Sequence, residues 1–382
     1  MYPNLNISQN VKSLHAIANR SPSLISRLMA NIQSQMMQFH EAIKLKRFEE
    51  NATLCEKRQI ILDRLDAGLK KLFASKNLQP PSYEKFDQGS YAMGTGVKPL
   101  GGNYDIDVGI CFKIAKADYP DPVKVKEWVL EALNNLTSCV EIRRPCVTVF
   151  YQRDGEAIYH VDLAIYSDSE CNPDGKMYLA KGKQNSSSEY RVWQEADPQG
   201  LMELIKNHFQ DSEDEKQFRR IIRYLKRWKD LKFSSDGNAA PIGIGITVAA
   251  YYWFVLKRSI DPFNSQRQYD DLDALGCFVQ VMISHFQPKY ADGTRYERLE
   301  VKLPVAPDCD LFEQMTDSQM TAFKEKLVAL LNTIHEAQKK ADPIGACKLL
   351  HEEQFRDDFP VPDRPSTGQQ RPPAIVSSSS SA

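Results

Sequence analysis

The chain has 382 residues, enough for two lobes of ordinary domain size with some shorter additional segments. Hydrophobic residues make up 42% and charged residues 26%, a globular composition that excludes a wholly disordered or fibrous chain. Its 49 Lys and Arg residues are balanced by 50 Asp and Glu residues, so the net charge of -1 excludes general coating of nucleic acid or membrane, and any anion site must be local.

The first predicted elements are helices. From Leu24 to Phe73, apolar residues recur at intervals of three and four with no proline, which is typical of long amphipathic helices. Pro80 and Pro81 end this region, and the next segment, Phe86 to Phe112, is rich in glycine at first and then has the pattern of a strand. We expect the helices to brace a lobe whose chemistry begins in that segment.

Two further strands are predicted downstream. Residues 140–151 and 158–166 are rich in β-branched and aromatic side chains, and the turn-forming sequence Arg153-Asp154-Gly155 separates them. This pattern is typical of a β-hairpin. Together with the strand that precedes Phe112, the hairpin predicts one sheet.

After Pro198 the pattern becomes helical. Apolar residues recur at three-to-four spacing in residues 201–209, 215–232, 242–257, 271–286 and 317–341, and Thr316 or Asp317 is a suitable N-cap for the last of these. We therefore predict an N-terminal lobe of residues 1–200 and a helical C-terminal lobe of residues 201–358. Residues 359–382 are rich in proline, serine and glutamine and predict a disordered tail.

Cysteine usage and hydropathy indicate the compartment. The eight cysteines form no C-x-x-C pair and no zinc-ligand spacing, so we expect reduced, mostly buried thiols. The N-terminus lacks the apolar segment of a signal peptide, and the longest apolar run, Ile242 to Leu256, is short and interrupted by glycine. These features predict a soluble cytoplasmic protein without a membrane segment.

One pair of carboxylates stands out. Asp105 and Asp107 are two residues apart in an apolar run, and the period of two along a strand places both on one face. Because the two charges repel, the pair calls for a cation, and carboxylate oxygens favour Mg²⁺. The same spacing occurs at Asp271 and Asp273 and at Asp308 and Asp310, so the spacing alone more often marks surface acid.

Two further features separate Asp105 and Asp107 from the other pairs. Asp162 lies in the apolar strand VDLAI, where it supplies a third carboxylate on a neighbouring strand. Gly89 and Ser90 follow a β-like segment and predict a strand-to-helix turn whose N–H groups and hydroxyl bind phosphate oxygens. A Gly-Ser turn beside three carboxylates is the arrangement that two-metal nucleotidyl transfer requires.

Other phosphate-binding motifs fit poorly. Gly94-Thr95-Gly96 leads to Pro99 where a dinucleotide-binding loop has glycine, Gly243 and Gly245 lead to Val248, and the P-loop pattern is absent. The sequence therefore disfavours the Rossmann and P-loop interpretations.

The pattern Gly89-Ser90, Asp105-Ile-Asp107-Val and Asp162 resembles the active-site signature of the cGAS/DncV-like nucleotidyltransferases (CD-NTases) of the polymerase-β superfamily, and the resemblance runs through most of the chain. It implies an α+β fold in which a polymerase-β-like nucleotidyltransferase lobe with a mixed β-sheet faces a helical C-terminal lobe across the active-site cleft. It also implies two Mg²⁺ ions, or Mn²⁺, with Asp105 and Asp107 as ligands of both. Asp162 would complete the second site and help activate the ribose hydroxyl.

The predicted helix 215–232 resembles the family helix that binds the triphosphate. Its R-x-x-K-x-W order implies that Lys226 holds the phosphates with Arg223 nearby, whereas a solvated basic helix face is the alternative interpretation. Tyr251 and Tyr252 are either base-stacking residues or simply core residues.

The resemblance implies that the enzyme condenses ATP, GTP or both into a cyclic di- or trinucleotide with release of pyrophosphate. This second messenger would act on a downstream effector in bacterial anti-phage defence. The alternatives are linear oligonucleotide synthesis, terminal nucleotidyl transfer to RNA, modification of a protein by a toxin–antitoxin-type nucleotidyltransferase and a non-catalytic scaffold.

Partner predictions also follow from the resemblance. A flexible tail that ends at Ala382 fits conjugation by a ubiquitin-transfer-like partner, although an incidental solubilising tail explains it equally well. Direct DNA binding is disfavoured, because the chain lacks the His/Cys cluster of vertebrate family members and has no net positive charge.

Overall fold

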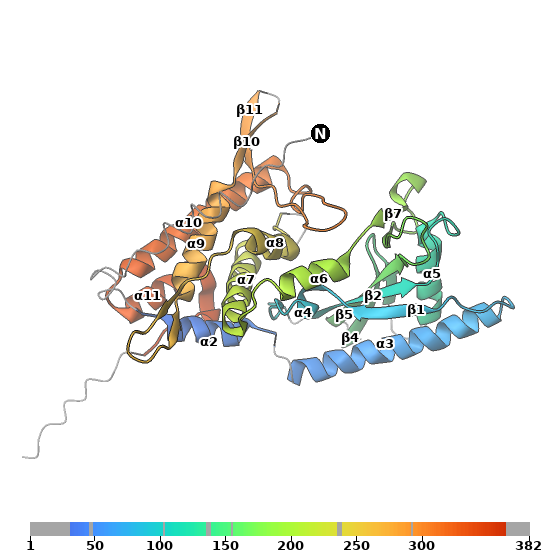
Figure 1. Ribbon diagram of the computed structural model, residues 1–382, viewed down its shortest axis with the longest axis horizontal. Coiled ribbons are helices and arrows are strands. Elements are labelled where there is room, and N and C mark those ends of the chain that lie inside the picture. Colours follow the sequence, from blue (N-terminus) through green and yellow to red (C-terminus); the bar gives the residue numbers. More distant parts are fainter. Residues whose placement is uncertain are drawn as a thin grey trace, which may run out of the picture.

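A sheet lobe and a helical lobe lie side by side in the computed structural model (Figure 1). The structure describes residues 31–45, 49–101, 104–134, 139–153, 156–234, 239–291 and 293–363. The predicted α+β fold, a mixed sheet followed by a helical lobe, is confirmed. Parts of two predictions lie outside the described residues: the start of the first helix at Leu24, and the tail beyond residue 363 with its conjugation at Ala382.

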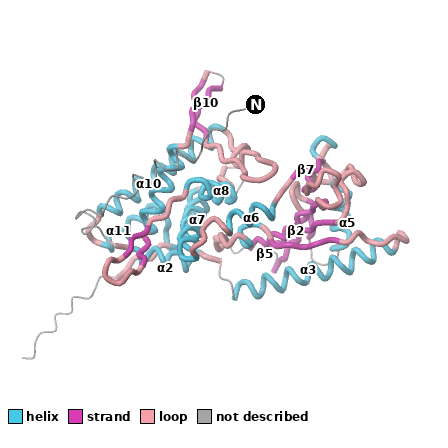
Figure 2. The backbone as a smooth tube through the Cα atoms, in the orientation of Figure 1, coloured by secondary structure: helices cyan, strands magenta, loops and turns pink. Residues whose placement is uncertain are grey.

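The sheet lobe holds seven strands, which Figure 2 distinguishes from the surrounding helices and loops. Their order is β1-β2-β5-β4-β3, with β6 paired to the end of β5 and β7 paired to β6. The strands are β1 (Tyr83–Asp87), β2 (Tyr104–Phe112), β3 (Cys139–Ile142), β4 (Val147–Arg153), β5 (Glu156–Ser167), β6 (Tyr178–Lys181) and β7 (Val192–Glu195). The helices are α3 (Glu49–Ala74), α4 (Gly89–Ala92) and α5 (Pro122–Leu133).

The two central strands, β2 and β5, are parallel, whereas their other neighbours are antiparallel. Alternation along these strands places one set of side chains, including Ile106, Val108, Val161 and Leu163, in the hydrophobic cluster with α3 and α5. The opposite face carries the polar residues and points into the space between the lobes. The predicted hairpin and the predicted single sheet are both confirmed by β4 and β5.

The helical lobe is built around α7 (Ser212–Lys232), whose apolar side chains from Phe218 to Trp228 are fully buried. Around it lie α6 (Pro198–Lys206), α8 (Gly243–Trp253), α9 (Asp271–Ser284), α10 (Asp317–Lys339) and α11 (Pro343–Leu350). Thr316 is the N-cap of α10 and forms a capping box with Gln319, as its sequence predicts. Two small hairpins, β8 (Arg258–Ile260) with β9 (Arg267–Tyr269) and β10 (Gln287–Ala291) with β11 (Thr294–Arg298), were not predicted.

The N-terminal helix α2 (Gln33–Ile43) belongs to the hydrophobic cluster of the helical lobe. Phe39 stacks on Tyr224 of α7 with ring centroids 5.1 Å apart, and the Tyr224 hydroxyl donates to the carbonyl of Met36. This placement differs from the expectation that all N-terminal helices brace the sheet lobe, because the apolar face of α2 fits α7, and of these two helices only α3 packs on the sheet. Phe359 is also buried in this cluster, so the helical lobe continues past its predicted end at residue 358.

All eight cysteines are free, in agreement with the sequence, but only Cys111, Cys146 and Cys347 are buried. Among the described residues, no helix is both long enough and apolar enough to cross a bilayer.

A buried lysine ties the far end of the sheet together. The Lys126 ammonium donates to the carbonyls of Arg143, Arg144 and Gly182 at 2.5, 3.0 and 2.9 Å. The side chain is fully buried, and burial lowers the pKa of Lys126 to about 8. Lys126 thereby joins α5 to the turn between β3 and β4 and to the loop after β6.

Replacing Lys126 with Met keeps the length of the side chain but leaves these three carbonyls without their donor. We expect a loss of about 3 kcal/mol in the free energy of unfolding, measured by urea titration. Lys124→Met on the same helix is the matched control, since that exposed lysine pairs only with Glu127, and its effect is expected to stay within about 0.5 kcal/mol. Equal effects of the two variants would contradict the role assigned to Lys126.

Candidate active site between the lobes

The carboxylates converge because of the register between β2 and β5. Asp107 lies opposite Asp162, and Asp105 lies opposite His160, so these four side chains form two adjacent rows on the polar face of the sheet. On the next strand, Thr148 lies opposite Asp162 and donates from its hydroxyl to Asp162 Oδ1 at 2.6 Å. The structure thus brings together the three aspartates that the sequence singles out.

The predicted strand-to-helix turn is present next to these aspartates. β1 ends at Asp87, and the short helix α4 begins at Gly89. Gly89 has φ +72°, and a Cβ atom placed on it would lie 1.9 Å from Asp107 Oδ2. Only glycine satisfies both the positive φ and the close approach of the carboxylate. The position of the turn and the position of the Asp107 carboxylate therefore depend on each other.

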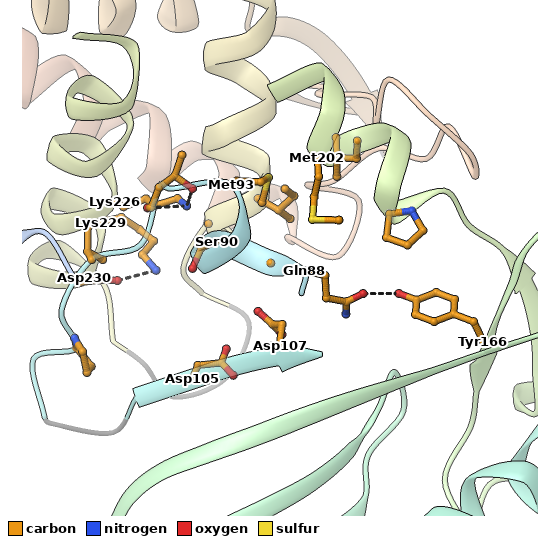
Figure 3. A pocket seen from close by; sticks show the side chains of 18 residues that line it. Gln88, Ser90, Met93, Asp105, Asp107, Tyr166, Met202, Lys226, Lys229 and Asp230 are labelled. Atoms are coloured by element: carbon orange, nitrogen blue, oxygen red, sulfur yellow. Dashed lines mark hydrogen bonds and ion pairs between the residues drawn. The ribbon is translucent and has the colours of Figure 1, made fainter. Parts of the chain in front are cut away.

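A cavity of about 540 Å³ lies between this turn, β2 and the helices α6, α7 and α8 (Figure 3). Five of the predicted site residues line it: Gly89, Ser90, Asp105, Asp107 and Lys226. Asp162 and Arg223 are not among the described residues that line it. The cavity therefore has an acidic floor on the sheet and a basic wall on α7.

Burial and mutual repulsion perturb the carboxylates. Burial, together with the charges of Asp105 and Asp162, raises the pKa of Asp107 to about 8. Burial also raises the pKa of Asp162, against the hydrogen bond from Thr148. A bound cation would relieve this repulsion.

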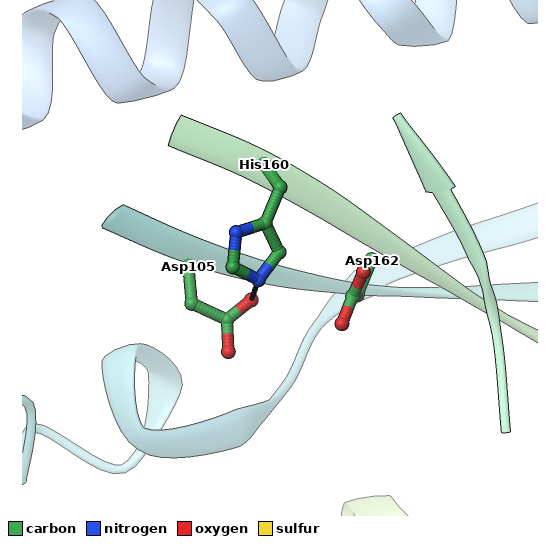
Figure 4. Close-up of side chains that lie close together, drawn as sticks. All are labelled: Asp105, His160 and Asp162. Atoms are coloured by element: carbon green, nitrogen blue, oxygen red, sulfur yellow. Dashed lines mark ion pairs between the residues drawn. The ribbon is translucent and has the colours of Figure 1, made fainter. Parts of the chain in front are cut away.

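The same corner holds a donor set that fits a divalent metal ion. Ligand atoms of Asp105, His160 and Asp162 lie within 4.8 Å of one another (Figure 4). Carboxylate oxygens suit Mg²⁺ and Mn²⁺. The predicted ligand Asp107 is not in this group, and its carboxylate lies against Gly89.

Lys226 reaches the cavity from α7. Its ammonium is 3.1 Å from Thr95 Oγ1 and 3.3 Å from the Thr95 carbonyl oxygen. Burial, with smaller contributions from the charges of Lys229 and Arg223, lowers the pKa of Lys226 to about 7. One turn further along, Lys229 pairs with Asp230 at 2.6 Å, and both line the cavity.

Arg223 lies behind the cavity wall and not in the cavity. Its guanidinium donates to the carbonyl oxygens of Gly96 and Gly94 at 3.0 and 2.5 Å and lies 3.0 Å from His40 Nε2. These contacts hold the loop that carries Thr95, the partner of Lys226. Arg223 therefore supports this loop, and its contact with the nucleotide stays a prediction.

The structure also shows the surroundings of Tyr251, Tyr252 and Asp271. Neither Tyr251 nor Tyr252 lines the cavity, and the Tyr251 ring packs against His208. Asp271 forms a buried ion pair with Arg220 at 2.6 Å, a structural role and not the surface position that its spacing suggests.

Four contributors were missed by sequence reasoning: His160, Thr148, Lys229 and Asp230. His160 precedes Asp162 by two residues, so the period of two that selected the aspartates also places it on their face. Lys229 follows Lys226 by three residues on one helix, which is a visible signal. Thr148 depends on the register of β4 with β5, which the predicted hairpin left unspecified.

The raised pKa of Asp107 predicts a pH-dependent stability. An unfolded chain ionises this carboxyl near pH 3.8, whereas the folded protein retains the proton to about pH 8, so stability is lost as the pH rises between these values. Asp107→Asn removes that loss. In EDTA, we compare the change in unfolding free energy that Asp107→Asn causes at two pH values. This change should be more favourable at pH 8.5 than at pH 4 by more than about 1 kcal/mol.

Urea unfolding at both pH values measures this gain. The exposed Asp118→Asn is the matched control and should have the same effect at both pH values. A gain for Asp107→Asn that does not change with pH would show that the carboxyl is not perturbed in this way.

Comparison with known proteins identifies the sheet lobe. Residues 84–166 match the family model described as the nucleotidyltransferase domain of cyclic GMP-AMP synthase DncV-like proteins. A cyclic GMP-AMP synthase from Escherichia albertii is 29% identical over 175 residues, which are 43% of this chain and 36% of that relative. The match thus spans little more than a third of the curated relative's length.

Solved structures share the fold over both lobes. Vibrio cholerae DncV, a cyclic AMP-GMP synthase crystallised with nonhydrolyzable GTP, has a TM-score of 0.62 at 16% identity, covering 85% of this chain and 96% of that one. E. coli CdnC with ATP has a TM-score of 0.60 at 18% identity, covering 86% of this chain and 98% of that one. At these identities the likeness concerns the fold.

The segment that matches the family model runs from β1 to β5 and contains the Gly89-Ser90 turn and all three aspartates. Residues 84–166 are therefore similar to the nucleotidyltransferase domain of DncV-like proteins, and the two-lobe fold is similar to that of the solved DncV and CdnC structures.

Proposed function

We propose that this protein is a nucleotidyltransferase that joins nucleoside triphosphates, ATP, GTP or both, into a cyclic di- or trinucleotide with release of pyrophosphate. The observation that carries the proposal is the β2–β5 register, which places Asp105, Asp107 and Asp162 beside the Gly89 turn at one cavity. The solved relatives were crystallised with ATP and with a GTP analogue, which supports the same substrate class here. Product release to an effector in anti-phage defence is the biological role that we infer from the family.

The residues divide the work by their place in the cavity. Ser90 and the backbone of the turn would hold the triphosphate from the sheet side, and Lys226 with Lys229 would hold it from α7. Lys226 is anchored to Thr95 in this structure, so binding a phosphate means exchanging one set of oxygen acceptors for another. The ammonium group of Lys226 would stay in the same place during this exchange.

The aspartates would hold two divalent ions, Mg²⁺ or Mn²⁺, which when bound neutralise the triphosphate and lower the pKa of the attacking ribose hydroxyl. Thr148 donates a hydrogen bond to Oδ1 of Asp162 and so orients this carboxylate. Asp162 would receive the hydroxyl proton as the oxygen attacks the α-phosphate of the second nucleotide and pyrophosphate leaves. Repetition on the other end of the linear product closes the ring.

The direct test is incubation of the purified protein with the four α-labelled NTPs and Mg²⁺ or Mn²⁺, followed by phosphatase treatment and separation of the products. We expect a phosphatase-resistant product that is absent with Asp105→Asn/Asp107→Asn, and omission of each NTP in turn identifies the bases. Nuclease digestion separates a ring from a linear oligonucleotide with internal linkages. A product that persists in the double variant would refute the assigned site.

The Gly89 turn gives a second prediction. In Gly89→Ala the added methyl group would meet the Asp107 carboxylate at 1.9 Å in a backbone conformation that alanine avoids, so the turn and the carboxylate must separate. We expect the rate of product formation to fall by about 100-fold, as for other displacements of about 1 Å at reacting groups.

Gly96→Ala is the matched control for this variant. It lies in the same loop, and its added methyl group would have its nearest neighbours at 3.5 to 3.7 Å, which is ordinary contact. Its rate should stay within a few-fold of the unmodified protein. Comparable losses in both variants, with unchanged melting temperatures, would count against a specific role for Gly89.

A further inference from the structure

We propose that His160 is a nitrogen ligand of a divalent ion at the carboxylate site, and that it shifts the preference of this site from Mg²⁺ toward Mn²⁺. This inference rests on the metal site of the proposed function and adds a ligand that the three-aspartate pattern does not contain.

The position of His160 is fixed by the strands. β5 places it directly opposite Asp105 and two residues before Asp162, on the polar face of the sheet. His160 Nε2 lies 3.2 Å from Asp105 Oδ1, and its side chain is only 15% exposed. Figure 4 shows Nε2 directed at the Asp105 carboxylate, with Asp162 alongside. The imidazole therefore belongs to the acidic corner and not to the solvent.

The spacing of the three side chains suits coordination. Ligands at about 2.1 Å from an octahedral ion lie about 3.0 Å apart when adjacent and about 4.2 Å apart when opposite. The 3.2 Å contact is close to the adjacent value, and the whole group lies within 4.8 Å, so the three side chains need to move only slightly toward an ion to coordinate it.

The surroundings hold the ring in place. The Phe150 ring lies opposite His160 in the β4–β5 register, with centroids 6.1 Å apart, and the Arg143 guanidinium lies 5.0 Å from the Phe150 centroid. An aromatic neighbour on one side and Asp105 on the other restrict rotation of the imidazole. A ligand that is already oriented costs less entropy when the ion binds.

The donor set determines the metal preference. Mg²⁺ is a hard ion that takes oxygen ligands almost exclusively, whereas first-row transition ions bind imidazole nitrogen well. Among those ions, Mn²⁺ also accepts carboxylates readily. A site with Asp105, Asp162 and His160 should therefore bind Mn²⁺ more tightly than an all-oxygen site does, relative to Mg²⁺.

The test is pulsed EPR of Mn²⁺ bound to the full chain labelled with ¹⁵N-histidine, in the presence of a nonhydrolysable ATP analogue at natural abundance. We expect a ¹⁵N coupling to Mn²⁺ that disappears in His160→Gln, whose amide can still donate a hydrogen bond to Asp105. His208→Gln, in the groove between α6 and α8, is the matched control and should retain the coupling. In parallel, the Mg²⁺ concentration that displaces half of the Mn²⁺ should fall about tenfold in His160→Gln only.

The outcomes separate this inference from the proposed function. Mn²⁺ binding that is lost in Asp105→Asn/Asp162→Asn but has no ¹⁵N coupling would overturn the role of His160 and leave the aspartate site intact. Mn²⁺ binding that survives the double aspartate variant, or no Mn²⁺ binding at all, would overturn the metal site itself. Unchanged melting temperatures of the variants exclude unfolding as the cause of any loss.

Discussion

The parallel pairing of β2 with β5 is the constraint on which the site depends. It places Asp107 opposite Asp162 and Asp105 opposite His160, so like charges are forced together at one corner of the sheet. Repulsion and desolvation oppose this arrangement, as the raised pKa of Asp107 reflects. The alternate side chains of the same strands are buried under α3 and α5, and this apolar contact fixes a register that the charges alone would not choose.

The helical lobe completes the site through hydrogen bonds to backbone carbonyls. Arg223 holds the carbonyls of Gly94 and Gly96, and Lys226 holds Thr95 between them. The loop that follows the Gly89 turn is thus attached to α7 at three successive residues. A movement of α7 relative to the sheet would be transmitted to the turn and, through the close contact of Gly89 with Asp107, to the carboxylates.

The sequence allowed much of this site to be predicted, because its main signals are local. The period of two along a strand selected Asp105, Asp107 and Asp162, and the glycine before an apolar segment located the turn. The strand registers and the contacts between distant helices were missed, since no local pattern encodes them. Thr148 acquires its role only when β4 pairs with β5, and α2 joins the helical lobe only through contacts with α7. The R-x-x-K-x-W order selects both Arg223 and Lys226, but only Lys226 is among the described residues that line the cavity.

The position of α2 has a consequence for the order of folding. The buried residues of the hydrophobic cluster in the sheet lobe lie between Ile61 and Ala180, all of which are synthesised in the first half of translation. Phe39 of α2, in contrast, packs against Phe355 and Phe359 near the end of the described chain, with ring centroids 4.7 and 5.3 Å apart. The sheet lobe can therefore form during translation, whereas α2 must wait for almost the whole chain before its partners exist. The cavity between the lobes, and with it any activity, is assembled last.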